Sequence, residues 1–335
     1  MSGPRVSVLM PVREARWLAE ALGTLLRKRP EGVEVVLVDD ARTGADRDGL
    51  SAEAARHGAR VVPAPPEGGL ARILNAGLAA CTAPLIARAD ADDRYAPDRL
   101  ARQAAAMAAR PGLVALSAGY RRIDAGGRPL WRHRPETDAA SLALHAMLGA
   151  PLLHPGAMIR ADALRAVGGY DPALWTAQDS DLWIRLSRMG ALGNLPEPLV
   201  DWREHGASVG ASRGAAGRAL SHGIAARAVE AFLGAPWPEA DAALDLWRGT
   251  GTMGRAGIIA GERGLARIAR AARARGPEGV ARRFERRLAA GMWRRARTQP
   301  AMAPLLVLRA AAWAAGRGPG AQAAPAPGVA AEARG

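Results

Sequence analysis

Cysteine is nearly absent from this chain of 335 residues, because Cys81 is the single one. One cysteine excludes an internal disulfide framework and any zinc site built from cysteines. Aromatic residues make up only 4% of the chain, which leaves few rings on which nucleic-acid bases could stack. Hydrophobic residues nevertheless reach 49% and charged residues 23%, so most of the chain can bury a core and wholesale disorder is excluded.

Lysine is also almost missing, since every basic residue except Lys28 is arginine. The formal net charge of +14 is spread unevenly along the chain. Residues 1–210 contain 26 basic and 24 acidic side chains, whereas residues 211–335 contain 20 and 8. This asymmetry indicates two regions, and it favours an acidic partner for the second one, such as a membrane surface or a nucleic acid.

Long hydrophobic runs are absent as well. The best candidate for a membrane-spanning segment, Ala301 to Gly316, is interrupted by Pro304 and Arg309, and a span needs about 18 uncharged apolar residues. The N-terminus enters an alternating apolar run by Val6 without the pattern of a signal peptide. We therefore expect a cytoplasmic protein that does not span the membrane and is either soluble or peripheral at its inner face.

The first third of the chain alternates short β-rich runs with stretches of helical period. Strands are predicted over Val6–Val12, Glu34–Asp40, Ala59–Ala64 and Pro84–Asp93, and helices over Trp17–Arg29, Asp46–His57, Gly69–Ala80 and Pro97–Arg110. Such repeated β-α-β units imply an α/β fold whose parallel sheet is covered by helices on both faces.

The pattern changes after residue 112. Strands are predicted over Leu113–Asp124, Arg128–Arg134 and Leu152–Arg160, helices over Ala139–Leu148 and Gln178–Met189, and an extended segment over Asn194–His205. From about residue 213 the chain is basic and helical, with breaks at Gly234–Pro238, Gly249–Gly257 and Arg275–Pro277. We expect a first domain over 1–212, a basic helical region over 213–316 and a disordered tail over 317–335.

Polar residues follow three of the predicted strands, at Pro11–Glu14, Asp39-Asp40 and Asp90–Asp93. Ligands of open α/β sheets bind beyond the carboxyl ends of the strands, so these residues are expected to converge. In an extended backbone Asp90 and Asp92 share one face and can approach the same cation. Their oxygen ligands suit Mg²⁺ or Mn²⁺. The alternatives are that Asp93 caps the following helix and that the Asp39-Asp40 pair is merely solvated in a loop.

The phosphate-binding loops of common nucleotide sites are missing. The chain has no P-loop, and no Gly-x-Gly-x-x-Gly follows its first strand. A nucleotide bound here would need a metal ion and basic side chains to neutralise its phosphates.

Several segments resemble the signatures of family 2 glycosyltransferases, which are inverting, nucleotide-sugar-dependent enzymes of the GT-A fold. The strongest are Val8-Leu9-Met10-Pro11-Val12, Val36-Leu37-Val38-Asp39-Asp40 and Ile86-Ala87-Arg88-Ala89-Asp90-Ala91-Asp92-Asp93. Further ones are Pro97-Asp98-Arg99-Leu100 with Gln103, His154-Pro155, Gly168-Gly169-Tyr170, Gln178-Asp179-Ser180-Asp181-Leu182-Trp183 and Asn194-Leu195-Pro196-Glu197-Pro198-Leu199. The resemblance covers roughly residues 5–210, in the family's order.

The resemblance implies a GT-A-type mixed, mainly parallel sheet with a nucleotide-binding half over about 1–112 and an acceptor half over about 113–212. Residues implied to contact the nucleotide or donor sugar are Pro11, Val12, Glu14, Asp39, Asp40, Arg72, Asn75, Arg88 and Asp90. Asp90 and Asp92 would hold Mn²⁺ or Mg²⁺ at the donor's diphosphate. Asp179 matches the family's catalytic base, although Asp at a helix start is also a favoured N-cap.

Three further residues leave alternatives open. His205 matches a family position that sometimes contacts the metal or the diphosphate, and otherwise has a structural role. His154 either contacts the acceptor or packs in the core. Asp181 is an acceptor candidate too, but it equally suits a role in supporting the turn.

Two departures from the family pattern concern the nucleotide pocket. Arg13-Glu14 replaces the usual Tyr-Asn-Glu, and Ala41-Arg42 replaces the frequent Gly-Ser. Arg13 or Arg42 is therefore a candidate phosphate contact. Gln178 stands where Glu is commoner.

In the basic helical region we recognise no resemblance to a family. Arg263, Arg267 and Arg270 recur at helical spacing. Either long arginine stems cover a small helical subdomain, or the region forms an amphipathic surface drawn to anionic lipid. We expect no nucleic-acid partner, since no recognisable module is present.

The sequence thus predicts a metal-dependent inverting glycosyltransferase. It would move a sugar from a nucleotide diphosphate sugar to a saccharide or lipid-linked acceptor, and by resemblance it would serve cell-surface polysaccharide or glycolipid synthesis. The alternatives are a nucleotidyltransferase on a similar sheet, or a non-catalytic scaffold that keeps the fold and docks on membranes.

Overall fold

The computed structural model describes residues 5–66, 68–205, 214–277 and 279–319. The chain forms two compact units, Met1–Ala228 and Val229–Gly335, whose boundary falls within helix α8 (Gly214–Leu233). The division into a domain over 1–212 and a helical region over 213–316 stays a prediction. Most of the expected disordered tail, residues 320–335, lies outside the described residues.

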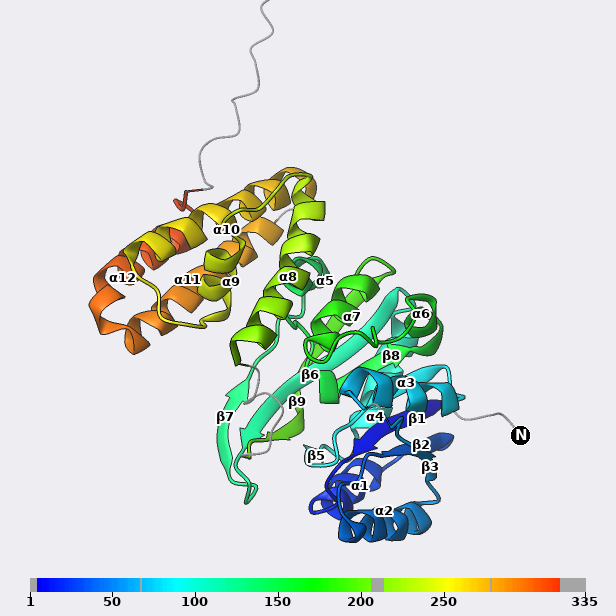
Figure 1. The fold of residues 1–335 in the computed structure, drawn as a ribbon. Helices are drawn as coiled ribbons and strands as arrows, with labels where there is room; N and C mark the ends of the chain where they lie inside the picture. The colour runs from blue at the N-terminus through cyan, green and yellow to red at the C-terminus, as the bar shows by residue number, and fades with distance from the viewer. Residues whose placement is uncertain (1–4, 67, 206–213, 278, 320–335) are drawn as a thin grey trace, which may run out of the picture. The chain divides into compact units, whose positions relative to one another are not determined.

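A mixed sheet forms the centre of the first unit (Figure 1). Its described strands follow the order β3-β2-β1-β4-β8-β6-β9-β5, with β7 paired to β6. They are β1 (Val6–Val12), β2 (Val33–Asp39), β3 (Arg60–Pro63), β4 (Leu85–Arg88), β5 (Arg94–Tyr95), β6 (Leu113–Ile123), β7 (Pro129–His133), β8 (Met158–Arg160) and β9 (Ala191–Arg203). The parallel pairs β1–β2, β2–β3, β1–β4 and β6–β9 hold most of the paired residues. The expected mixed, mainly parallel sheet is confirmed.

Helices cover both faces of this sheet, as the β-α-β pattern predicted (Figure 1). One face packs against α1 (Leu18–Leu26), α2 (Gly44–His57) and α4 (Arg99–Ala109). The other packs against α3 (Leu70–Ala80), α5 (Ala139–Ala146), α6 (Ala161–Ala166) and α7 (Gln178–Leu186). Because successive side chains of a strand point to opposite faces, Val8 and Met10 of β1 pack on the first side and Leu9 on the second.

Two predicted strands are wrong in their extent. The predicted strand Leu152–Arg160 is a 3-10 helix, η1 (His154–Gly156), followed by the short β8. Pro155 has no N–H for a strand ladder, and Gly156 is packed so closely that a Cβ there would lie 3.0 Å from Val200. The predicted strand Pro84–Asp93 already ends at Arg88.

The second unit is helical, as expected. Its described helices beyond α8 are α9 (Ala240–Arg248), α10 (Arg255–Arg275), α11 (Val280–Thr298), the 3-10 turn η3 (Pro300–Met302) and α12 (Ala303–Ala314). The three predicted breaks coincide with the ends of α8, α9 and α10. Helix α9 packs on α10, and α11 packs on α12, around a core that includes Trp237, Phe284 and Trp313.

Glu262 of α10 is a buried carboxyl group in this core, with 1% of its surface exposed. Its Oε1 accepts a hydrogen bond from Trp313 Nε1 at 3.0 Å, and its Oε2 lies 3.3 Å from Arg309. Burial raises the pKa of Glu262, although both partners act in the opposite direction. The described part of the chain contains no helix with the length and apolar character that a bilayer crossing requires.

Candidate active site

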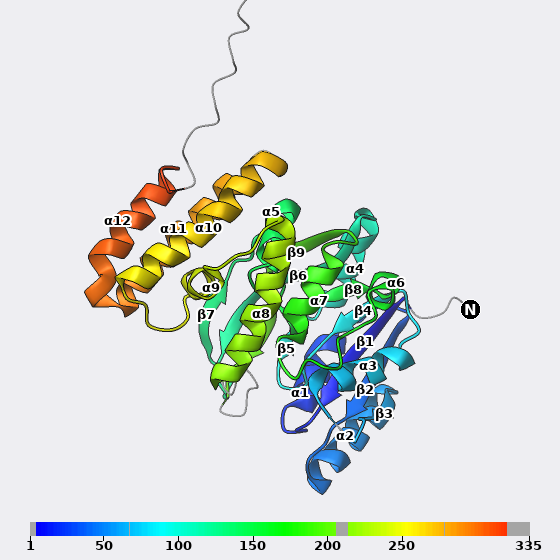
Figure 2. The same cartoon turned by 45° about the horizontal axis from the view of Figure 1, so that its top comes forward.

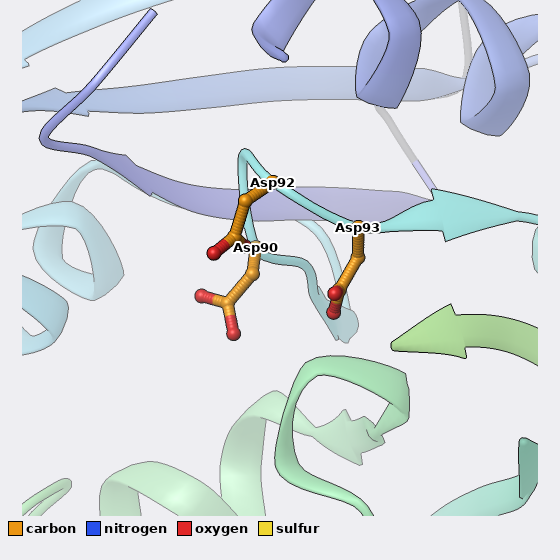
Figure 3. Close-up of side chains that lie close together, drawn as sticks. All are labelled: Asp90, Asp92 and Asp93. Carbon is orange, nitrogen blue, oxygen red and sulfur yellow. The ribbon is translucent and has the colours of Figure 1, made fainter. Parts of the chain in front are cut away.

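Three carboxylates gather in the turn that follows β4, which we call the acidic turn. Asp90, Asp92 and Asp93 each offer an oxygen, and these oxygens all lie within 4.8 Å of one another. In Figure 3 the side chains of Asp90 and Asp92 lie side by side, while Asp93, where the next strand begins, points its carboxylate to the same side. We predicted this convergence from alternation along a strand, which is wrong. The strand ends at Arg88, and a turn at Ala91 and Asp92 brings the groups together.

Cationic and hydroxyl groups hold the first two acids. Arg88, which is 1% exposed, donates from Nη2 to Asp90 Oδ1 at 2.6 Å. His205 Nε2 lies 2.8 Å from Asp92 Oδ2. The hydroxyl of Tyr95 accepts from the Asp90 N–H at 2.6 Å and donates to the Asp90 carbonyl at 2.9 Å. The turn is therefore fixed through both its backbone and its side chains.

Arg203, at the end of β9, fixes the rest of the turn. Its N–H donates to Asp93 Oδ1 at 2.8 Å, and its guanidinium donates to the Asp92 carbonyl at 2.7 Å. The same guanidinium reaches the Ala125 carbonyl at 2.9 Å and Glu20 Oε2 at 2.7 Å. The suggestion that Asp93 caps the next helix is wrong, because this carboxylate binds Arg203 and the N-cap position of α4 is Asp98.

The burial and mutual repulsion of the acids in this turn raise the pKa values of Asp92 and Asp93. Burial, followed by the charge of Asp90, raises the pKa of Asp92, while His205 opposes this shift. Burial raises the pKa of Asp93 well above its ordinary value, and the charges of Asp92 and Asp90 add to the effect. Carboxylates placed in this way repel one another unless a cation lies among them.

The predicted nucleotide residues lie along the same edge of the sheet. Strand β1 lies between β2 and β4, with Val12 beside Asp39 and Leu9 beside Arg88. The Asp40 N–H donates to the Val12 carbonyl at 3.0 Å. Pro11 is half-buried within β1, and Glu14 is exposed in the loop after it. The expected convergence of the three polar strand ends is confirmed by these pairings.

The acids at the end of β2 are paired with arginines. Asp40 accepts from Arg13 Nε at 2.8 Å and lies 3.6 Å from Arg42 Nη2. Asp39 accepts from Arg47 Nε at 3.2 Å. The suggestion that these acids are only solvated is therefore wrong. Arg13 and Arg42, which both belong to departures from the family pattern, meet at Asp40.

Helix α3 holds the loop that leads towards α7. The amide of Asn75 donates to the Tyr170 carbonyl at 2.7 Å and accepts from the Tyr170 N–H at 2.9 Å. Arg72 Nε donates to the Pro172 carbonyl at 3.4 Å. Gly169, with φ +70°, lies so close that a Cβ would be 2.6 Å from the Asn75 amide oxygen. Both side chains that we expected to face the donor thus bind this loop.

Asp179 is the second residue of α7, which follows Ala177 in the left-handed conformation at φ 57°. The N-cap position is Ala177, so the alternative that Asp179 caps the helix is wrong. Asp179 Oδ1 accepts from the Ser180 N–H at 2.8 Å. Burial raises the pKa of Tyr170; Arg88 opposes the shift, while the charges of Asp179 and Asp90 add to it. The expected base and the acidic turn therefore act on the same buried hydroxyl.

The two acceptor candidates have structural partners. His154 Nε2 lies 2.8 Å from the Tyr170 hydroxyl, and burial, followed by the charge of Arg88, lowers the pKa of His154 well below its usual range. Asp181 Oδ2 accepts from Arg185 Nη2 at 2.6 Å and Nε at 2.8 Å. The Arg185 guanidinium also donates to the Val167 carbonyl at 2.7 Å. These contacts are those expected of packing and turn support.

A partly exposed aromatic cluster, which the sequence reasoning missed, lies where β6, β7 and β9 pair. The ring of Tyr120 lies 5.7 Å from that of Trp131 and 6.0 Å from that of Trp202. The guanidinium of Arg122 lies over both tryptophans, at 5.5 and 5.0 Å. Trp131 is 43% exposed, and Trp202 immediately precedes Arg203. The sequence signal was the placement of rings on three predicted extended segments, but only the strand pairing brings them together.

The acidic turn has the features of a divalent cation site. Its donors are all oxygens, which is the ligand type that Mg²⁺ and Mn²⁺ prefer. Among the described residues, the buried Oδ2 of Asp93 has no hydrogen-bond partner. A cation would satisfy this atom and relieve the repulsion that raises the carboxyl pKa values of Asp92 and Asp93.

The chain is similar in sequence to known glycosyltransferases. The family model described as glycosyl transferase family 2 matches residues 7–167. The putative glycosyltransferase EpsE of Bacillus subtilis is 32% identical over 209 residues, which cover 61% of this chain and 74% of EpsE. The O-antigen biosynthesis protein RfbC of Myxococcus xanthus is 32% identical over 249 residues. That match covers 70% of this chain but only 19% of RfbC.

A solved structure shares the fold over nearly the whole chain. TarS 1–349 of S. aureus in complex with UDP-GlcNAc superposes with a TM-score of 0.56, covering 93% of this chain and 92% of that one at 15% identity. At this identity the likeness concerns the fold, and it confirms the expected GT-A-type architecture with C-terminal helices.

Proposed function

Because the chain belongs to glycosyltransferase family 2, we propose that it transfers a sugar from a nucleoside diphosphate sugar to a saccharide or lipid-linked acceptor with inversion. The observation that carries the proposal is the acidic turn, in which Asp90, Asp92 and Asp93 bring carboxylate oxygens within 4.8 Å of one another. The name of RfbC supports a role in cell-surface polysaccharide or glycolipid synthesis. We place this activity in the cytoplasm, at the inner face of the membrane.

The donor's diphosphate would lie at the acidic turn. Asp90 and Asp92 would hold Mn²⁺ or Mg²⁺, with Asp93 and His205 next to them. When bound, such a cation stabilises as a Lewis acid the negative charge that develops on the leaving diphosphate. Arg88, which is buried and bound to Asp90, would fix that carboxylate's orientation towards the cation.

The nucleotide would occupy the edge formed by the ends of β1 and β2. Pro11, Val12 and Glu14 would line its pocket, and Asp40 would hydrogen-bond the base, with Asp39 beside it. Arg13 or Arg42, both of which pair with Asp40, would contact a phosphate of the nucleotide. Arg72 and Asn75 would position the loop before α7.

The acceptor hydroxyl would lose its proton to Asp179. The Ser180 N–H holds one carboxylate oxygen, Oδ1, and the other, Oδ2, would receive the proton as the hydroxyl attacks. A hydroxyl is a poor nucleophile until a positioned base removes its proton, a contribution of about 10²–10⁴-fold in rate. Attack from the face opposite the leaving group inverts the anomeric centre.

The rings of the exposed Trp131 and the half-buried Trp202 would receive a sugar of the acceptor. An aromatic ring offers an apolar face to the C–H face of a pyranose, and Arg122 beside the rings offers donors to its hydroxyls. Trp202 is joined directly to Arg203, which binds the acidic turn, so an acceptor held here would lie near the donor site.

Calorimetric binding of nucleoside diphosphates tests the donor site. We would titrate UDP, GDP, TDP and CDP into the purified full chain, first with Mn²⁺ and then with EDTA, beginning with UDP because TarS was solved with it. We expect one nucleotide to bind in the presence of Mn²⁺ and its binding to vanish with EDTA. Failure of all four to bind would overturn the donor site and favour the non-catalytic scaffold.

Two matched variants separate metal binding from proton removal. Asp92→Ala should abolish metal-dependent nucleotide binding, whereas Asp179→Asn should bind the nucleotide normally and lose about 10²–10⁴-fold of turnover, measured as transfer or as donor hydrolysis. The exposed Asp48 of α2 gives the control variant Asp48→Asn, which should change neither. Full turnover by Asp179→Asn would remove this residue from the role of base.

A further inference from the structure

Helix α11 of the second unit presents a basic face with a tryptophan in it. Arg282, Arg286, Trp293 and Arg297 are exposed, and their spacing places them on one side of the helix. The opposite side is buried in the core. Trp293 is 48% exposed, and among the described residues none of the three arginines forms an ion pair with a carboxylate.

The outer face of α12 is apolar. Leu308 is 68% exposed, the most of any large hydrophobic residue in the described chain. The exposed neighbours on its side of the helix, one and two turns away, are Pro304, Ala311 and Ala315. The inner side, with Leu306 and Trp313, is buried. Helix α12 thus offers solvent an uncharged surface with a protruding leucine.

These two faces belong to neighbouring helices. Helices α11 and α12 pack on each other and are joined by the short turn η3, so they run as a hairpin, seen side by side in Figures 1 and 2. Trp293 lies five residues before the end of α11 and Leu308 five residues after the start of α12. At 1.5 Å per residue, both side chains lie at about the same level of the hairpin. At its other end, the Arg282 guanidinium lies against Gly316.

We propose that this surface, the α11–α12 face, docks the chain on an anionic lipid bilayer. Leu308 would enter the acyl region, the Trp293 ring would lie at the level of the headgroups, and the arginines would meet their phosphates. The charge of this region supports an anionic bilayer as the partner, since residues 211–335 contain 20 basic and 8 acidic side chains. Basic amphipathic surfaces with Trp and Leu also bind membrane interfaces. A second copy of the chain would bring like charges together. The inference stands on the second unit alone and does not depend on the proposed reaction.

Vesicle flotation of the full chain tests the α11–α12 face. We would use vesicles of phosphatidylglycerol and phosphatidylcholine in equal parts, with vesicles of phosphatidylcholine alone for comparison. We expect binding to the anionic vesicles only, weakened by salt. Each arginine near an anionic surface contributes about fivefold to partitioning, so the double variant Arg286→Ala/Arg297→Ala should bind about 25-fold more weakly. Leu308→Glu should also lose binding.

The matched control is Arg27→Ala/Lys28→Ala, which removes the same charge from exposed positions at the end of α1. It should float like the wild type. Thermal unfolding by circular dichroism checks that each variant is folded, and calorimetric nucleotide binding should be unchanged in all of them. An equal loss by the control pair, binding without phosphatidylglycerol, or no binding would overturn the proposal. A dimer detected by light scattering and dissociated by Leu308→Glu would also overturn it, because the α11–α12 face would then bind a second copy of the chain.

Discussion

Replacing Arg203 by alanine should destabilise the first unit and loosen the acidic turn. This side chain is 1% exposed, although it carries a full charge. Its guanidinium donates to the main chain of Asp92 in the acidic turn, to that of Ala125 in the β6–β7 hairpin, and to Glu20 in α1. One residue therefore connects three elements that are far apart in the sequence. An alanine at position 203 has no side-chain donor that could replace these hydrogen bonds.

The expected loss follows from burial. Hydrogen bonds that involve a charged group contribute about 1.5–3 kcal/mol each, and breaking a buried ion pair costs about 3–5 kcal/mol. Glu20 is partly exposed and keeps an ion pair with Arg94 at 2.5 Å, which lowers the contribution of the Arg203–Glu20 pair to the loss of stability. We expect Arg203→Ala to reduce the free energy of unfolding by about 3–5 kcal/mol.

Arg121 provides a matched control on the neighbouring strand. It also makes two hydrogen bonds to a carboxylate, at 2.6 and 2.9 Å to Asp201, but its side chain is 47% exposed. Exposed pairs of this kind contribute about 0–1 kcal/mol, so Arg121→Ala should be nearly neutral. Urea unfolding of both variants measures the difference, and calorimetry with Mn²⁺ should show weaker nucleotide binding for Arg203→Ala alone. Equal losses of unfolding free energy in the two variants would refute the argument that burial makes the interactions of Arg203 more stabilising than those of Arg121.

Three further predictions concern packing and protonation. Gly77→Ala should cost about 1–3 kcal/mol in urea unfolding, because a Cβ there would press on Leu9. Gly23→Ala, which meets no atom within 4 Å, should instead stabilise α1 by about 0.5–1 kcal/mol. Burial, followed by the charge of Glu34, raises the pKa of the Cys81 thiol to about 12, so Ellman's reagent at about pH 8 should label only the unfolded chain; rapid labelling of the native protein would contradict this. For Glu262 the folded-state pKa is raised, so the native state holds the proton more tightly and stability falls as pH rises through that pKa. The wild type should therefore lose stability relative to Glu262→Gln as the pH rises above the ordinary glutamate pKa of about 4.3, and the opposite trend in urea unfolding would count against a net cost of the buried charge.

For strands and helices that depend on local sequence, the predicted ends lie within a few residues of the observed ones. In β1, apolar side chains alternate between two packed faces, and the predicted and observed bounds are both Val6–Val12. Helix α2 shows its own start and stop, since Thr43 caps it through a hydrogen bond from the Asp46 N–H at 3.1 Å and Gly58 ends it with φ 61°. Such signals act over a few residues and need no partner elsewhere in the chain.

The elements that depend on distant partners were missed. The two-residue strand β5 exists because Arg94 and Tyr95 pair with Asp201 and Val200, which no local pattern indicates. The region around His154 reads as a strand from its apolar residues, but its backbone bends where Gly156 meets β9. Here packing against a remote strand overrode the local preference.

By itself, the sequence determined the α/β class of the sheet, the basic second region and the acids that follow its strands, because residue types and their order are local properties. Only the tertiary structure decided which groups meet. It brought Asp93 and Arg203 into the acidic turn, occupied Asn75 with the backbone of Tyr170, and gathered the aromatic cluster of β6, β7 and β9. These outcomes depend on contacts between residues that are far apart in the sequence, such as Arg203 with Asp93, 110 positions away. Such contacts form only when the sheet is assembled, because their free energy comes from burial and pairing that no single segment contains.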